Sequence, residues 1–435
     1  MLELIDGREQ STPVHISRPR PAPGGPDPRD AVTATVEDVR LRGDEALIEL
    51  TERFDGVRLG PDRIKVDEAL IAKATDLVRP ELLHALEVMA ERMRRTCERQ
   101  MPSEWTETGV GESVGELIRP LNRVGVYAPG GRASYPSSVV MAAIPAQVAG
   151  VEGIAVCSPP RPGSNEIAES VLAACAVTGI TEVYRLGGAQ AIAAMAYGTT
   201  SVRPVEKIVG PGNLYVTLAK RRVQGWVGVD SEAGPTELAI VADDSMDPMT
   251  LATDLVAQAE HGPLGSHILI TWIPEVAERV MRALETAVAR HERADDVENA
   301  LTEGGKAILV KDLDHALETA NTFAAEHLQL AFEGAEETLP RISSAGSVFV
   351  GPYSPVAVGD YVGGTNHVLP SGGTARWSSG LGVNDFVKRI YVSNFDKGAL
   401  ERFAAHVDAL AEAEGLPAHS RTVTQRLEDR REPLL

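Results

Sequence analysis

The stretch VEGIAVCSPPRPGSNEIAESVLAACAVTGITEVYRLGGAQAIAAMAYG, residues 151–198, decides the fold class. Its short runs EGIAVC and ITEVYR are rich in valine and isoleucine, and helix-like segments such as AQAIAAMAYG alternate with them. Strands that alternate with helices form βαβ units, in which the strands lie parallel in one sheet. The pattern continues to about Pro235 and predicts an α/β domain with a parallel sheet.

A second alternating block follows this domain. Its strand candidates are ELAIVAD, HILITW, KAILV, LQLAF and SVFVG, with helix-like segments between them. Apolar residues recur every three or four positions over residues 30–97, which is typical of helices, and beyond about Ser379 the chain is again mostly helical and charged. A proline- and glycine-rich linker at 18–28 follows a short N-terminal arm. We therefore expect two α/β domains with helical segments at both ends of the chain.

Composition narrows the class of protein. A chain of 435 residues predicts two or more domains, and 43% hydrophobic and 24% charged residues are typical of a soluble globular protein. The net charge of −20 argues against a nucleic-acid-binding surface. The N-terminus MLELIDGREQ has no apolar core, and Pro145 and Glu152 interrupt the apolar run 139–156, which we interpret as a buried helix plus a strand. We expect neither a secretory signal nor a membrane span.

The three cysteines, Cys97, Cys157 and Cys175, are far apart and form no CxxC pair. This spacing favours a reducing cytoplasm and argues against a thiolate zinc site. Cys157 ends a strand-like run, so a catalytic thiol there is the alternative to a small buried residue.

Three glycine-rich loops follow strand-like runs, at 125–138, 186–195 and 210–216. The carboxyl ends of parallel strands are where α/β sheets bind ligands, and backbone N–H groups there can hold phosphate. None of the loops matches G-x-G-x-x-G, and each could instead be a tight turn without a ligand. Together they favour a nucleotide.

The triplet AEH occurs twice, at 259–261 and 325–327. Asp247 and Pro248 are typical of a helix start, and in that helix Gln258 and His261 are three residues apart, so they share a face and could converge on one ion. The alternative is that His261 is only a capping or a core histidine.

The second triplet lies in a helix predicted from about Asp314 to Leu328. Glu326 and His327 could both edge a cleft at its end and form an acid–base pair, because histidine titrates near neutrality and burial can tune the carboxylate. The alternative is an exposed glutamate beside a hydrogen-bonded histidine.

The long glycine-rich segment 356–381 carries Asp360 and His367, and a Gly-Leu-Pro break near the C-terminus separates Glu414 from His419. Long segments without regular structure are usually functional in compact domains. Two histidines, an aspartate and an amide are ligands that zinc accepts without cysteine.

Taken together, these stretches closely resemble the histidinol dehydrogenase family, nearly end to end from the linker to His419. The order and spacing of seven motifs carry the resemblance: GVYAPGG, GGAQAIAA, GPGN, EAGPTE, QAEHG, AAEHLQL and GDYVGGTNHVLP.

The resemblance implies roles for individual residues. Glu326 and His327 look like the acid–base pair. The family's four zinc ligands correspond to Gln258, His261, Asp360 and His419, with His419 supplied by the second subunit of a domain-swapped homodimer. The implied NAD contacts are Tyr127, Gln190 and Asn213. The implied substrate contacts are Thr236, which is often serine in the family, together with Gln258, His261, His327, Asp360, His367, Glu414 and His419.

The resemblance also implies a domain plan and a reaction. Two Rossmann-like domains with incomplete parallel sheets are expected. Their limits are 1–24 for the arm and linker, 25–121 with 237–380 for the first domain, which carries the metal and acid–base residues, 122–236 for the NAD domain, and 381–435 for a helical segment that reaches the partner. The implied reaction converts L-histidinol, two NAD+ and water to L-histidine and two NADH through a bound aldehyde, in the last two steps of histidine biosynthesis.

Four other functions compete with this one. They are a Cys157-dependent aldehyde oxidation, a zinc hydrolase with Glu326 as base, a zinc- and NAD-dependent dehydrogenase of another small alcohol, and a binding protein without catalysis. The hydrolase would not need the three glycine loops, and a binding protein would not need Glu326 and His327.

Overall fold

The computed structural model describes residues 1–19, 27–130, 134–231 and 234–428, which divide into two compact units. The first unit is Met1–Gln100 with Leu121–Phe386, and the second is Met101–Pro120 with Val387–Leu435. Most of the expected linker, residues 20–26, lies outside the described part of the chain.

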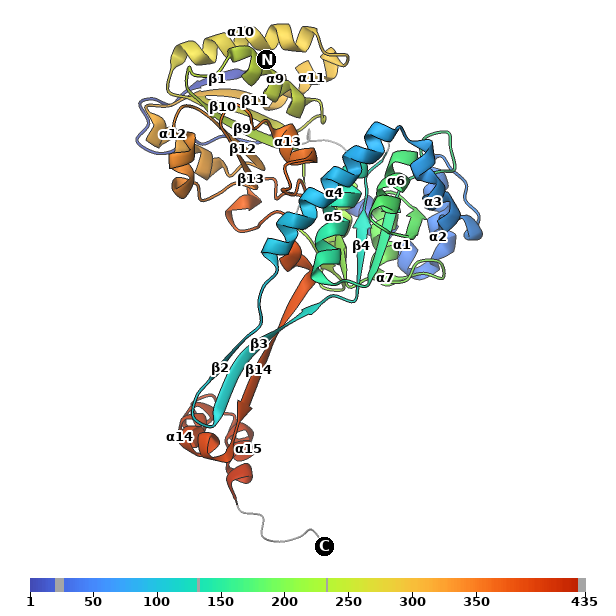
Figure 1. The fold of residues 1–435 in the computed structure, drawn as a ribbon, viewed down its shortest axis with the longest axis vertical. Coiled ribbons are helices and arrows are strands. Elements are labelled where there is room, and N and C mark those ends of the chain that lie inside the picture. The colour runs from blue at the N-terminus through green and yellow to red at the C-terminus, as the bar shows by residue number, and fades with distance from the viewer. Residues whose placement is uncertain (20–26, 131–133, 232–233, 429–435) are drawn as a thin grey trace. The chain divides into compact units, whose positions relative to one another are not determined.

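The first unit contains two parallel sheets with helices packed on them (Figure 1). The strand order is β1-β11-β10-β9-β12-β13 in the six-stranded sheet and β6-β5-β4-β7-β8 in the five-stranded sheet. The α/β fold with parallel sheets is therefore confirmed. The strands of the six-stranded sheet are β1 (Glu3–Asp6), β9 (Glu237–Ala242), β10 (Ser266–Thr271), β11 (Gly305–Leu309), β12 (His327–Ala331) and β13 (Ser347–Val350), and those of the five-stranded sheet are β4 (Arg123–Tyr127), β5 (Gly153–Ser158), β6 (Glu182–Arg185), β7 (Lys207–Val209) and β8 (Gly228–Val229).

The six-stranded sheet is covered on both faces. Successive side chains of a strand point to opposite faces, so Leu238 and Ile240 pack in one apolar cluster while Ala239 and Val241 pack in the other. The first cluster also receives side chains from α9 (Pro248–Ala259), α10 (Pro274–Ala289) and α11 (Ala294–Gly304), and the second from α12 (Leu313–Phe323). Because both faces of the sheet are buried, the sequences of these strands are continuous runs of apolar residues.

The five-stranded sheet shares its core with the N-terminal helices. Val36 and Leu47 pack with Ile192 and Ile208 in one apolar cluster. The prediction grouped residues 28–55 with 237–380, but their apolar faces pack in the core of the five-stranded sheet. The exact domain limits stay a prediction. The helices of this half of the unit are α1 (Pro28–Arg42), α2 (Asp44–Asp55), α3 (Glu68–Leu77), α4 (Pro80–Gln100), α5 (Pro136–Ala149), α6 (Glu169–Val177), α7 (Gly188–Tyr197) and α8 (Leu214–Val223).

The apolar run 139–156 forms most of α5 and then part of β5, as expected. Among the described residues, no helix combines the length and apolar character that crossing a membrane requires.

The second unit is a three-stranded antiparallel sheet with two helices. Its order is β14-β3-β2, formed by β14 (Val387–Phe395), β3 (Glu112–Pro120) and β2 (Trp105–Thr108), and the helices are α14 (Lys397–Ala413) and α15 (Pro417–Leu427). The expectation of a mostly helical chain beyond Ser379 was wrong for β14. This strand is exposed along nearly its whole length, so its sequence lacks the alternation of apolar and polar residues that marks a half-buried strand.

Candidate active site

Glu326 and His327 lie at the start of a strand and not on a helix. Helix α12 ends at Phe323, Ala324 caps it in the left-handed conformation with φ +52°, and β12 begins at His327. The predicted helix was therefore wrong over residues 324–328. Apolar residues in a short run fit a buried strand as well as a helix, and the left-handed turn at Ala324 had no glycine to signal it.

His327 is buried, and one of its two ring nitrogens has no hydrogen-bond partner among the described residues. Its Nδ1 lies 3.0 Å from the main-chain carbonyl of Glu237, and because a carbonyl only accepts, the proton is on Nδ1. Nε2 has no hydrogen-bond partner among the described residues. Burial lowers the pKa of His327 to about 4, so the ring is neutral near pH 7 and Nε2 can accept a proton.

Glu326 is also buried, at 7% exposure. Its Oε2 accepts the main-chain N–H of Glu237 at 3.0 Å and lies 3.6 Å from Nδ1 of His327. Burial raises the pKa of Glu326 well above its usual range, because desolvation disfavours the charged form of the carboxyl group. The alternative of an exposed glutamate beside a hydrogen-bonded histidine is wrong for Glu326, which is buried, and right that His327 is hydrogen-bonded.

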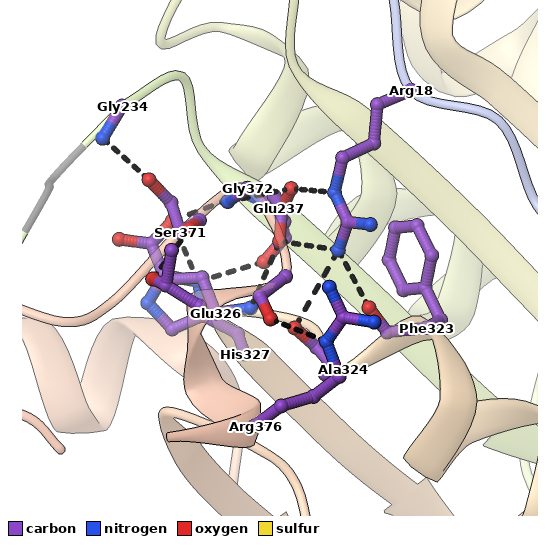
Figure 2. Close-up of polar contacts among 12 residues, drawn as sticks. Arg18, Gly234, Glu237, Phe323, Ala324, Glu326, His327, Ser371, Gly372 and Arg376 are labelled. Atoms are coloured by element: carbon purple, nitrogen blue, oxygen red, sulfur yellow. Dashed lines mark hydrogen bonds and ion pairs between the residues drawn. The ribbon is translucent and has the colours of Figure 1, made fainter. Parts of the chain in front are cut away.

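Glu237 and Arg18 belong to this site and were not predicted (Figure 2). Oε1 of Glu237 accepts from Arg18 Nε at 2.5 Å and from the N–H of Gly372 at 3.1 Å. Glu237 could have been found, because a charged residue that opens a buried strand needs a partner. No sequence pattern marked Arg18 as a site residue, since it lies in the segment that was expected to be a linker.

The ligand-type side chains of α9 lie where the sequence predicted. Asp247 caps the helix by accepting the N–H of Met249, as expected. Gln258 is buried, and its Oε1 accepts the hydroxyl of Thr236 at 2.8 Å. Nδ1 of His261 lies 3.2 Å from the carbonyl of Ala257. His261 thus contacts a carbonyl of the last helical turn, and its Nε2 still carries a lone pair for an ion, so metal binding by His261 stays a prediction.

Asp360 and His367 join the same region from the segment after β13. Asp360 lies in the short helix α13 (Val356–Tyr361), with Oδ1 3.9 Å from Nε2 of His327. Burial raises the pKa of Asp360 to about 6, and the charge of His261 opposes this shift. Nδ1 of His367 lies 3.0 Å from the carbonyl of Asp360, and Nε2 lies 3.5 Å from Oγ of Ser138.

The donors of the first unit suit zinc but do not complete a site. Gln258, His261 and Asp360 offer oxygen and nitrogen ligands of the kind that zinc accepts. Within the described ranges, no group of three or more His, Cys, Asp or Glu side chains is arranged to hold a metal ion. The two remaining predicted residues lie in the second unit, where Glu414 follows α14 and His419 lies in α15, both exposed.

The predicted cofactor residues stand at one edge of the five-stranded sheet. Tyr127 ends β4 and its hydroxyl accepts the N–H of Gly188 at 3.0 Å. Gln190 is buried in the first turn of α7, just after β6, and Asn213 caps α8, just after β7. The three loops thus follow the carboxyl ends of β6, β4 and β7 of one parallel sheet, with β5 between β6 and β4, and this edge is where such sheets bind ligands. Residues 131–133 of the first loop lie outside the described residues.

Cys157 is not placed to react. It is fully buried in β5, and burial raises the pKa of its thiol well above the ordinary value. A buried thiol of high pKa is a poor nucleophile, so the structure favours the small buried residue over the catalytic thiol.

Comparisons with known proteins agree with one another. A family model described as histidinol dehydrogenase matches residues 20–427. A histidinol dehydrogenase from Bifidobacterium longum is 42% identical over 442 residues, covering 98% of this chain and 93% of that protein. One from Natronomonas pharaonis is 46% identical over 403 residues, covering 92% and 94%. The crystal structure of histidinol dehydrogenase from Elizabethkingia anophelis has a TM-score of 0.91 at 34% identity and covers 98% of each chain.

Proposed function

The chain belongs to the histidinol dehydrogenase family, and from that premise we propose that it oxidises L-histidinol to L-histidine with two NAD+ and one water, through an L-histidinaldehyde that stays bound. This reaction makes up the last two steps of histidine biosynthesis. The observation that supports it most is the bare Nε2 of His327 beside the buried carboxyl of Glu326. Two successive oxidations need more than one proton transfer, and the start of β12 supplies two proton acceptors.

His327 takes the hydroxyl proton of histidinol as the first hydride leaves for NAD+. Its Nδ1–H stays on the Glu237 carbonyl, so Nε2 is the atom that receives the proton. Glu326 then accepts a proton from the water that adds to the aldehyde. His327 releases its proton to solvent and then serves again, taking a hydroxyl proton of the hydrated aldehyde as the second hydride leaves.

Zinc completes the substrate pocket in this proposal. Its ligands are Gln258, His261, Asp360 and His419. Zinc in this family holds the imidazole and amino group of the substrate and takes no part in the redox step. Thr236, His367 and Glu414 add substrate contacts, together with the ligands and His327.

NAD lies on the carboxyl edge of the five-stranded sheet in this proposal. Tyr127, Gln190 and Asn213 contact it from three neighbouring loops. Backbone N–H groups of these loops and of the helix starts beside them can hold its phosphates without a basic surface.

The active form is a domain-swapped homodimer, in which His419 and Glu414 come from the partner copy. The second unit supports this by its own composition, because α14 buries only Ala399 and Ala411 among its residues, and α15 buries none. Large apolar side chains of the second unit are exposed, for example Tyr391 at 80% and Leu410 at 64%. Exposed apolar surface of this kind marks an interface. We place the dimer in the cytoplasm, which the three buried free cysteines favour.

The test is the amount of NADH formed per L-histidinol consumed, before and after chelator treatment and again after zinc is added back. Two NADH per substrate, lost on chelation and restored by zinc, is the expected result. One NADH, or none, would instead favour a related dehydrogenase of another small alcohol.

A further inference from the structure

Glu237 contacts both predicted proton acceptors at once. Its carboxylate Oε2 accepts the main-chain N–H of Glu326 at 3.3 Å, and its own N–H donates to Oε2 of Glu326 at 3.0 Å. Its carbonyl accepts from Nδ1 of His327 at 3.0 Å. The start of β9 therefore fixes the backbone and side chain of Glu326 and the ring orientation of His327.

Arg18 holds the Glu237 carboxylate from the N-terminal arm. Its Nε and Nη2 reach Oε1 and Oε2 of Glu237 at 2.5 and 3.2 Å, in a two-point contact on a side chain that is 4% exposed. A buried carboxylate without a partner would be strongly unfavourable, and the fork of arginine suits it better than a lysine.

The same guanidinium also holds the turn that leads to Glu326. Nη2 donates to the carbonyl of Phe323 at 2.6 Å, and the guanidinium lies over the Phe323 ring, 4.1 Å from its centroid. Ala324 follows in its left-handed conformation. Figure 2 shows Arg18 between the end of α12 and the start of β9, in contact with both.

We infer that Glu237, held by Arg18, is a positioning residue that orients Glu326 and His327 for both proton transfers. The inference rests on the proposed function, since it assigns Glu237 and Arg18 to that same site. Neither residue is a catalytic group here, because Glu237 acts through Glu326 and His327, and Arg18 acts through Glu237 and through the turn after Phe323.

If Arg18 and Glu237 had only a structural role, substitutions that break the pair would lower the stability of the protein without a selective loss of kcat. The chain offers a matched control in Arg123 and Glu182, another partly buried two-point pair with contacts of 2.7 and 2.5 Å. These residues stand at the amino ends of β4 and β6, away from the carboxyl edge where the cofactor loops meet.

The experiment compares the full-length parent with Glu237→Gln, Arg18→Lys and Glu182→Gln by steady-state kinetics and thermal unfolding. We expect kcat to fall about 10- to 100-fold in the first two variants, as is typical when a partner that orients a catalytic group is lost. KM for L-histidinol and NAD+ should change by no more than about 3-fold, because the substrate and cofactor contacts remain. Glu182→Gln should lower the melting temperature with kcat unchanged.

Three results would overturn the inference: a folded Glu237→Gln variant with the kcat of the parent, an equal loss of kcat in Glu182→Gln, or KM values that rise as steeply as kcat falls. If Glu237→Gln does not fold, Arg18→Lys decides by the same criteria. A parent that forms no NADH from L-histidinol would contradict the proposed function itself and is thereby distinguished from failure of the positioning role.

Discussion

Nδ1 of His327 donates to the main-chain carbonyl of Glu237 at 3.0 Å. This single contact fixes the tautomer of the ring and leaves Nε2 bare in a buried site. The assignment of His327 as the proton acceptor of both oxidations depends on it.

His327→Asn removes the base and keeps the contact, because the asparagine amide can still donate to the Glu237 carbonyl. We expect kcat to fall by about 10²- to 10⁴-fold with either histidinol or the aldehyde as substrate, as is usual on loss of a general base. NADH formation from each substrate measures it. His315→Gln is the control, since the buried His315 is not among the predicted site residues and its ring contacts the main chain, through Nε2 to the carbonyl of Thr12 at 3.0 Å and through Nδ1 to the N–H of Lys311 at 3.4 Å, and that variant should keep the parent kcat. A His327→Asn variant that loses activity toward only one substrate would contradict the double role.

Cys157→Ser tests the rival mechanism. Its thiol is fully buried with a raised pKa, so we expect kcat to stay within about 2-fold of the parent while stability falls by about 1 to 3 kcal/mol, the cost of a buried hydroxyl without a partner. Steady-state rates and urea unfolding measure the two effects. A large loss of aldehyde oxidation in a folded variant would restore the thiol mechanism.

Much of the fold could be predicted from the sequence because burial leaves a regular pattern. The continuous apolar runs of β9 to β12 and the Asp247-Pro248 start of α9 each follow from a local rule. The end of α12 could not be placed, since Ala324 adopts a left-handed conformation that normally favours glycine.

The site was predicted only in part, for a related reason. Residues with the side chains of acid–base chemistry stood out. Glu237, in contrast, acts through contacts 89 and 90 positions away in the sequence, and Arg18 through contacts 219 and 305 positions away. No local pattern encodes such pairs, because they exist only once the sheet has formed.

Ala324→Gly should stabilise the protein by up to about 1 kcal/mol, because glycine adopts φ +52° without the strain of a Cβ atom. Ala324→Val should destabilise it by more than about 2 kcal/mol, since the residue is fully buried and a branched side chain is strongly disfavoured there. Urea unfolding gives both values. Ala320→Gly, inside α12, is the control and should cost about 1 kcal/mol. Destabilisation by Ala324→Gly as large as that of the control would refute the strain.

Mixing two variants that are each defective in aldehyde oxidation tests the shared site. If His419 acts in the partner's site, a dimer of Glu326→Gln and His419→Ala chains has one intact site and one doubly altered site. Random exchange of subunits should then restore about a quarter of the parent activity, because half of the dimers are mixed. NADH formation from L-histidinaldehyde after co-refolding measures the recovery. No recovery, in a mixture shown to contain mixed dimers, would place His419 in its own chain's site.

The central claim is the division of labour between Glu326 and His327, and the measurement that tests it most directly is the rate of each oxidation in Glu326→Gln. Single-turnover NADH formation from L-histidinol and from L-histidinaldehyde separates the two steps. We predict that oxidation of histidinol stays within about 10-fold of the parent while oxidation of the aldehyde falls by about 10²-fold or more, since only the second step needs an activated water. Equal losses in both steps would contradict the assignment of Glu326 to the water and His327 to the hydroxyl.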